Sequence, residues 1–174
     1  CGPAAGARPT AGHPDGPFPG RPGPTGARAG TVGPRSTTLP AAMALGAEAI
    51  QVGSRFAVSE ESSAHERFKK KVIEINEGDT RLLLKKLVPV RMIKNQLSER
   101  LDEAESKGAG RRELLTLLGE GKSKLGIFDG DTEEGELEIG QVSALISSIE
   151  PAGDIVQDII NEFRIALGQL TENS

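Results

Sequence analysis

The sequence predicts an α/β protein: one helix–strand unit and a mostly helical C-terminal region, behind a disordered N-terminal tail. Three observations support this fold class. Residues 41–54 predict a helix, a short loop, an apolar strand and a glycine turn, which form the second half of a βαβ unit. From residue 63 onward, apolar residues recur at the spacing of amphipathic helices. Residues 1–40 hold nine of the 11 prolines and nine of the 22 glycines, a composition that cannot build a core.

The tail, residues 1–40, is interpreted as disordered because its only bulky apolar residues are Phe18, Val32 and Leu39. Four arginines and one aspartate give it a net charge of +3. Its prolines include pairs at PxxP spacing, which suit an SH3-type groove, and its scattered arginines allow contact with nucleic acid. A third hypothesis is that a frameshift in a GC-rich gene produced this mixture. An intact reading frame that encodes the same residues would contradict that hypothesis.

The 174-residue length and the composition of the whole chain set outer limits on function. The length suits one domain of ordinary size. A net charge of −4 predicts no attraction to nucleic acid or to an anionic membrane. The single cysteine, Cys1, excludes an internal disulfide framework. No apolar run approaches 18 residues and no signal-peptide core is present. A reducing, cytoplasmic setting is therefore the expectation.

The helix–strand unit begins at Pro40, since proline suits the first turn of a helix, and Gly46 suits its end. Residues 49–52 then predict a buried parallel strand that ends in Gly-Ser. Glycine lets a phosphate approach the backbone, and the following amides and hydroxyl can donate hydrogen bonds to it. A plain turn is the alternative. The candidate phosphate-binding residues are Gln51, Val52, Gly53 and Ser54.

The middle of the chain starts with a predicted capping box, with Ser63 as the N-cap and Glu66 at the third helical position. The helix that follows is predicted to end at Gly78. Residues 80–93 hold two apolar runs, but Pro89 excludes a central strand position. We expect irregular or edge-type extended structure there.

Five further helices are predicted from apolar stripes at helical spacing and from the glycines and the proline that bound them. These stripes are core faces rather than cofactor sites. The helices span residues 96–107, 111–118, 122–128 and 136–149, and a last one opens at Pro151.

No residue is predicted to be catalytic or to bind a metal. The acidic run from Asp129 resembles a calcium-binding loop, but Glu134 and Gly140 occupy the places that require glycine and glutamate. His65 lies at the start of a helix, where a capping role is favoured over catalysis. The sequence contains no Walker loop and no GxGxxG motif. The residues alone therefore offer half a phosphate site and no general base.

Residues 41–56 taken together resemble the FMN-dependent nitronate monooxygenase (2-nitropropane dioxygenase) family, which includes FMN-dependent enoyl-acyl-carrier-protein reductases. The resemblance covers about residues 41–165. It continues through Ser63-Ala64-His65, Gly78-Asp79-Thr80, Pro89-Val90-Arg91, Lys94-Asn95, Gly130-Asp131, Gly135 and Gly140-Gln141.

The resemblance implies a TIM barrel with a small helical substrate domain, and FMN at the C-terminal mouth of the barrel. It implies that residues 41–174 are the C-terminal part of such an oxidoreductase, with Gln51–Ser54 ending the eighth strand at the FMN phosphate. The implied substrate is a small molecule, either a nitronate or an enoyl thioester. No nucleic-acid or membrane partner is implied, and the oligomeric state stays open.

The resemblance also implies what this chain lacks. The family carries a Gly-Gly-Ile stretch before the helix, whereas residues 31–38 do not align with it. The first six strands and the family's catalytic histidine have no counterpart. We therefore expect this chain to bind FMN poorly or not at all, because two strands cannot close a barrel. The competing hypothesis is a non-enzymatic helical interaction protein.

Overall fold

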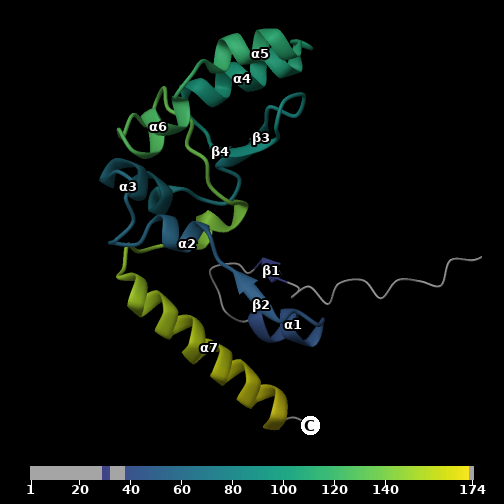
Figure 1. Ribbon diagram of the computed structural model, residues 1–174, viewed down its shortest axis with the longest axis vertical. Helices are drawn as coiled ribbons and strands as arrows, with labels where there is room; N and C mark the ends of the chain where they lie inside the picture. The colour runs from purple at the N-terminus through teal and green to yellow at the C-terminus, as the bar shows by residue number, and fades with distance from the viewer. Residues whose placement is uncertain (1–28, 32–37, 173–174) are drawn as a thin grey trace, which may run out of the picture.

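A computed structural model describes residues 29–31 and 38–172 of the chain (Figure 1). The predicted disorder of residues 1–28 and 32–37 lies outside this range. Residues 29–31 belong to the same predicted tail, but they form the strand β1 (Ala29–Thr31). The prediction of disorder is wrong for these three residues. Their composition builds no core, but backbone hydrogen bonds with a neighbouring strand hold them in an extended conformation.

The predicted helix–strand unit is present and gains a strand. β1, α1 (Thr38–Ala44) and β2 (Ala49–Gln51) form a βαβ unit in which the two strands pair in parallel. Ala29 pairs with Ala49 and Thr31 with Gln51. Pro40 lies in the first turn of α1, as predicted, and Gly46 follows the helix with a φ of +91°. The expected burial of the strand is wrong: Ala49 and Gln51 are exposed, since among the described residues only β1 pairs with β2.

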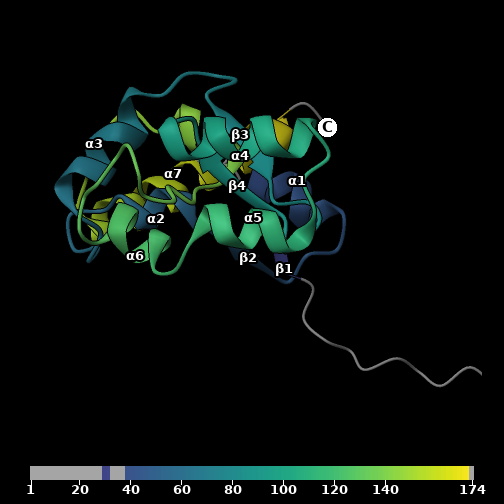
Figure 2. The same cartoon turned by 90° about the horizontal axis from the view of Figure 1, so that it is seen from above.

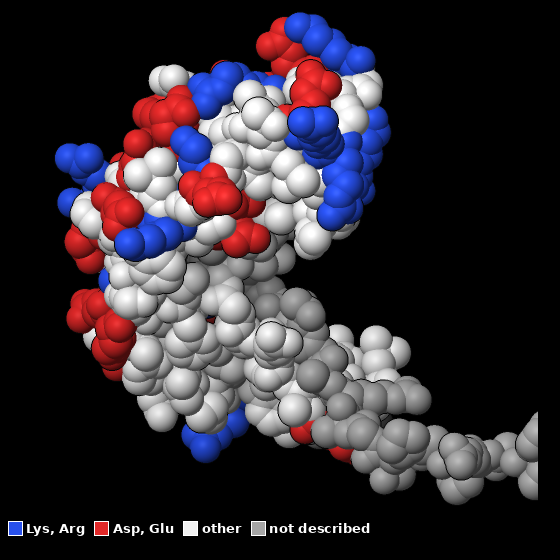
Figure 3. Space-filling view, turned by 45° about the horizontal axis from the view of Figure 1, so that its top comes forward, with Lys and Arg blue, Asp and Glu red and all other residues white. Residues whose placement is uncertain are grey.

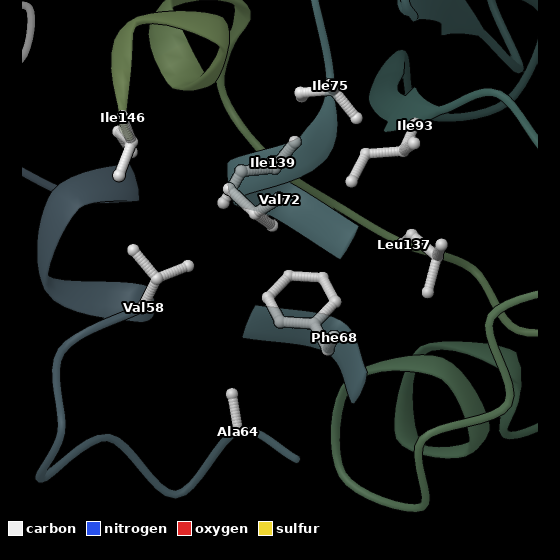
Figure 4. Close-up of a cluster of buried hydrophobic side chains, with 9 residues drawn as sticks. All are labelled: Val58, Ala64, Phe68, Val72, Ile75, Ile93, Leu137, Ile139 and Ile146. Carbon is white, nitrogen blue, oxygen red and sulfur yellow. The ribbon is translucent and has the colours of Figure 1, made fainter. Parts of the chain in front are cut away.

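The first core lies around α3 (Glu66–Glu74), next to the short helix α2 (Ser54–Ala57). Figure 4 shows the ring of Phe68 at its centre. Phe68 and Val72 come from one face of α3, at the predicted helical spacing, and both are at most 1% exposed. The other buried members are Val58, Ala64, Ile75, Ile93, Leu137, Ile139 and Ile146.

The start of α3 differs from the predicted capping box. The N-cap is His65, whose Nδ1 accepts a hydrogen bond from the backbone N–H of Arg67 at 3.1 Å. Ser63 is exposed and lies outside the helix. The difference arises because the His65 N–H donates to the Ile127 carbonyl at 2.7 Å, which fixes the point where the chain enters the helix. α3 also ends earlier than predicted, at Glu74, ahead of the turn at Gly78.

The second core lies under an antiparallel hairpin of β3 (Thr80–Leu83) and β4 (Val90–Ile93). This confirms the extended structure predicted for residues 80–93, with Pro89 just outside the ladder. Figure 2 shows α4 (Gln96–Ser106) and α5 (Arg111–Leu118) beside the hairpin. Both helices confirm the predicted ranges to within one residue. The buried members of this core are Leu83, Leu84, Met92, Leu97, Leu101, Ala109 and Leu114.

The segment after α6 (Lys122–Ile127) is extended, although residues 136–149 are predicted to be helical. Its backbone adds to β4: the Ile93 N–H donates to Leu137 O at 3.0 Å, and the Ile139 N–H donates to Arg91 O at 3.2 Å. Only a 3₁₀ turn, η1 (Gln141–Leu145), follows. Pairing with the edge of β4 outweighs helical spacing, because it satisfies backbone groups that the edge would otherwise expose.

The chain closes with α7 (Ala152–Glu172), which starts directly after Pro151 as predicted and packs against α1 and α2. We call residues 58–150 the body of the molecule. We call β1, α1, β2 and α7 the βα end, which lies below the body in Figure 1. No helix in the described part of the chain has both the length and the apolarity needed to cross a bilayer.

Candidate functional site

The predicted phosphate-binding residues lie where β2 passes into α2. Val52 and Ser54 are half-buried, and Gln51 and Gly53 are exposed. A Cβ atom placed on Gly53 would find nothing within 4 Å. The first amides of a helix have no partner within that helix, so an anion can approach the backbone at Gly53 without steric hindrance. The local geometry is therefore compatible with the predicted role.

Ser54 is held from the side of the body by Gly140. The Gly140 N–H donates to Ser54 Oγ at 3.1 Å. A Cβ atom on Gly140 would lie 2.6 Å from that oxygen, so only glycine fits this position without a shift. The hydroxyl hydrogen of Ser54 is still available as a donor. This contact joins two parts of the chain that the sequence analysis did not connect.

A shallow cavity of about 500 Å³ opens at this loop. Arg91 is the one basic residue of its lining, and its Nη1 donates to Thr80 Oγ1 at 3.1 Å. Glu138 is the one acidic residue, and burial, followed by the nearby Glu136, raises the pKa of its carboxyl group. The lining residues are Gly53, Ser54, Ala57, Pro89, Val90, Arg91, Glu138, Ile139 and Gly140.

Behind the loop, Arg55 connects α2 to the segment that precedes α7. Its Nη1 donates to the Ser148 carbonyl at 2.8 Å, and its Nη2 pairs with the carboxylate of Glu150. The Arg55 side chain is only 12% exposed. The Glu150 backbone carbonyl also accepts the Glu60 N–H at 3.0 Å. α2 and the turn that follows it are thus held by contacts with a distant part of the chain.

Most of the residues that carry the family resemblance hold the fold rather than line the cavity. The amide of Asn95 donates to the carbonyls of Thr132 and Gly135, at 3.0 and 2.8 Å. Gly130 leaves room for His65, since a Cβ there would lie 2.4 Å from the ring. These contacts fix the loop that carries the acidic run. Only residues 53, 54, 89–91 and 140 of the resembling blocks reach the cavity.

The acidic run itself is a hydrogen-bonded turn. Asp131 Oδ1 accepts the N–H groups of Glu134 and Glu133, at 2.8 and 3.0 Å, and these bonds lower the pKa of Asp131. Among the described residues, no group of three or more His, Cys, Asp or Glu side chains is placed to hold a metal ion. The carboxylate of Asp131 is thus used in shaping the loop.

Sequence reasoning missed Arg55, Glu138 and Glu150 as neighbours of the loop at Gly53. The contacts of Ser54 and Arg55 with the later segment span 86 and 95 residues. No spacing rule connects positions so far apart. The one available signal was Gly140, which the family resemblance includes without giving it a role.

The chain belongs to the nitronate monooxygenase family. The model of this family, described as "Nitronate monooxygenase", matches residues 29–162, from β1 into α7. The family match thus begins at β1, ahead of the region from residue 41 on which the resemblance was based.

Particular relatives agree with this assignment. A Bacillus subtilis (strain 168) protein described as a probable nitronate monooxygenase is 50% identical over 42 residues, which are 24% of this chain and 12% of that protein. The structure of FabK from Thermotoga maritima matches with a TM-score of 0.75 and 30% identity, over 84% of this chain and 47% of that one. Nitroalkane oxidase from Streptomyces ansochromogenes matches with a TM-score of 0.64 and 24% identity, over 82% and 40% of the two chains, and shows the shared fold alone.

These matches confirm the α/β class and a partial likeness to a TIM-barrel-type fold. The chain spans less than half the length of the solved structures that it resembles. In its described part the parallel sheet has two strands and is not closed.

Proposed function

We propose that this chain carries part of an FMN-dependent oxidoreductase of the nitronate monooxygenase type, and that Gln51, Val52, Gly53 and Ser54 form one half of the FMN phosphate site. The observation that carries the proposal is the open approach at Gly53 beside the Ser54 hydroxyl, at the edge of a cavity. Arg91 adds a positive charge to the lining, which favours an anion. Membership of the nitronate monooxygenase family supports the same reading.

A bound flavin would supply the redox chemistry, because it accepts electrons from the substrate and passes them on. The residues of this chain would hold its phosphate and shape the adjoining wall. Glu138 lies in the same lining and is easier to protonate than an ordinary glutamate. Its neutral form would reduce the repulsion of a phosphate.

The substrate proposed is an alkyl nitronate, which the enzyme would oxidise with O2. The relative from Bacillus subtilis, described as a probable nitronate monooxygenase, supports this choice. The alternative is reduction of an enoyl thioester by an FMN-dependent enoyl-acyl-carrier-protein reductase, which the resemblance to that branch of the family supports. Assays with both substrates on the FMN-loaded protein would separate the two. The cytoplasmic setting expected from the sequence stays a prediction.

The isolated chain is expected to bind FMN weakly. In the described part of the chain, β1 and β2 form the whole parallel sheet, and eight strands are needed to close a barrel. A second candidate function, a non-enzymatic interaction module, is favoured by a separate observation. All buried members of the two hydrophobic cores belong to the body, so neither core uses residues of the parallel sheet.

Purification of the chain with excess FMN tests the site. We expect weak, substoichiometric flavin absorbance, with FMN bound more tightly than riboflavin, because only FMN offers a phosphate to the loop. Ser54→Ala should remove that difference. Thr116→Ala, which removes an exposed hydroxyl on α5, is the matched control and should leave it unchanged. A stoichiometric yellow complex would contradict the claim that this chain holds only half of the FMN site. Equal affinities for FMN and riboflavin would contradict the claim that the loop binds the phosphate.

A further inference from the structure

The tip of the β3–β4 hairpin packs against the connection between α4 and α5. Lys86 Nζ donates to the carbonyls of Gly108 and Ala109, at 3.0 and 2.7 Å. α5 begins two residues further on, at Arg111. Because Lys85 precedes Lys86 on the hairpin tip, two lysines lie close to the first turn of α5.

This part of the body carries a cluster of positive charges, which we call the basic surface: Lys85, Lys86, Arg111 and Arg112. All four residues are exposed. No ion pair joins any of them to a carboxylate in the described part of the chain. Figure 3 shows Lys and Arg side chains gathered along the upper right edge of the molecule. Like charges without partners repel one another, so the basic surface favours contact with an anionic group.

The two arginines lie where their charge weakens the helix. Both are in the first turn of α5, whose N-cap, Gly110, has no side chain to accept hydrogen bonds from the first amides. Cations at the start of a helix interact unfavourably with its macrodipole. The stability of α5 therefore does not account for Arg111 and Arg112, whereas contact with a negatively charged surface does.

Exposed apolar side chains adjoin the basic surface. Val88, near the hairpin tip, is 71% exposed, and Leu115 is 49% exposed. Leu115 follows Arg111 by four residues and so lies on the same side of α5. The chain has no Tyr and no Trp, which are the side chains that stack best on the bases of a nucleic acid. Charge beside exposed apolar groups suits a protein partner.

The chain carries a surface of the opposite charge in the loop that follows α6. Residues 128–138 contain six Asp and Glu and no Lys or Arg. Two cations pair with Glu134, but Asp129 and Glu133 are exposed and form no ion pair with a described residue. Phe128, next to them, is 50% exposed. We call Phe128, Asp129 and Glu133 the acidic surface.

The basic and acidic surfaces are complementary, since each combines unpaired charge with exposed apolar side chains. A two-fold axis would let each of two copies give its basic surface to one contact and its acidic surface to the other. Both contacts would then form in one closed dimer. The net charge of −4 on each chain opposes this only weakly, because salt screens charges that are more than about 8 Å apart.

We propose that a second copy of this chain occupies the basic surface, with the acidic surface of each copy against the basic surface of the other. The charge pairs would surround a contact between Val88, Leu115 and Phe128. This interface does not depend on whether the loop at Gly53 binds a flavin.

Sedimentation of the full chain at two salt concentrations tests the proposal. We expect a dimer whose Kd rises by about tenfold or more between about 0.05 M and about 0.5 M NaCl, because salt screens exposed charge pairs. A monomer at both concentrations would overturn the proposal. A dimer with the same Kd at both would overturn it too, since it would be held by apolar contacts alone.

Charge reversal locates the two surfaces. Arg111→Glu combined with Arg112→Glu should raise the Kd by about tenfold or more, although acidic residues suit the start of α5 better. Asp129→Lys combined with Glu133→Lys should have a similar effect. An equimolar mixture of the two double variants should regain most of the affinity of the unchanged chain, because the reversed surfaces are again complementary.

The matched control is Lys70→Glu combined with Lys94→Glu, which makes the same change of net charge at two exposed residues outside both surfaces. It should leave the Kd within about twofold. Equal weakening by this control would overturn the assigned surfaces, and so would a mixture that stays monomeric. A monomer that binds a poly-glutamate peptide through Arg111 and Arg112 would assign the basic surface to a different acidic protein and overturn the dimer.

Discussion

The body and the βα end of this molecule differ in how much of their apolar surface they bury. The body holds two closed cores under a densely charged surface. In the βα end, Pro40 and Ile155 are the only buried residues among those whose burial is described. The difference teaches that, in the described part of the chain, the body has its own hydrophobic cores, whereas the βα end leaves most of its side chains exposed or half-buried.

The largest expected effect is the difference in unfolding free energy lost when a large apolar side chain is truncated in each of the two regions. Leu97→Ala removes a fully buried side chain from the second core and should lower the free energy of unfolding by about 2–5 kcal/mol. Leu170→Ala, on the exposed side of α7, should change it by less than about 0.5 kcal/mol. Urea unfolding followed by circular dichroism measures both. Similar losses at the two positions would show that the βα end is packed as tightly as the body.

The next effect tests how α2, which lies between the two regions in the chain, is held to the body. Arg55→Ala removes the half-buried pair with Glu150 and the bond to Ser148 O. It should lower the free energy of unfolding by about 1–3 kcal/mol, because partly buried acceptors lose a charged donor. Arg81→Ala breaks the more exposed pair with Asp102 and should cost about 0–1 kcal/mol.

Chemical denaturation of the two arginine variants, with Glu150→Gln added to each, completes the test. Glu150→Gln should be non-additive with Arg55→Ala and additive with Arg81→Ala. Additivity in both cycles would mean that Arg55 does not hold α2 to the later segment.

A smaller effect concerns the start of α3 in the body. His65→Ala should lower the free energy of unfolding by about 1 kcal/mol, because the Arg67 N–H loses its acceptor. Ser63→Ala should change it by only a few tenths of a kcal/mol, since Ser63 is exposed and does not cap the helix. Thermal unfolding distinguishes the two variants. A larger loss of unfolding free energy for Ser63→Ala would support the capping box predicted from the sequence.

The smallest effect is a pH dependence at the cavity that α2 and the body line together. The folded state raises the pKa of Glu138 through burial and through Glu136. Its stabilising contribution is therefore present at low pH and is lost as the pH rises through the folded pKa. Glu138→Gln should stabilise the fold at neutral pH by less than about 0.5 kcal/mol and have no effect well below an ordinary glutamate pKa.

Glu103 serves as the control for Glu138, because its pKa is shifted in the opposite direction. Lys107 donates to Glu103 and lowers the pKa of that carboxyl group, so its contribution is present at neutral pH and is lost as the pH falls. Glu103→Gln should therefore weaken the fold at neutral pH. Melting temperatures of both variants are compared with that of the unchanged chain across the acidic pH range. If both substitutions shift the melting temperature in the same direction at neutral pH, the opposite pKa shifts of Glu138 and Glu103 are refuted.

Much of the fold followed from local patterns. Glycine and proline positions with one apolar stripe were enough to predict α4, α5 and the start of α7. The helix predicted for the segment after α6 is wrong because the buried residues of this segment, Leu137 and Ile139, alternate along an extended chain. That alternation is a strand signal, and the apolar residues further along concealed it.

The candidate site was predictable only in part. Gly53 and Ser54 stood out because glycine and serine at the end of a strand are typical of anion binding. The opposite wall, with Arg91 and Glu138, comes from the hairpin and from the segment that pairs with it. Nothing local in the sequence indicates which distant segment will lie across from a loop, because that depends on how the elements pack.

The contact between Ser54 and Gly140 has a consequence for the order of folding. It joins residues 86 positions apart, and long-range contacts of this kind form late because the intervening loop must close first. On a ribosome, the loop at Gly53 emerges well before the residues that fix its shape. The loop at Gly53 should therefore be among the last features of the nascent chain to reach its native geometry.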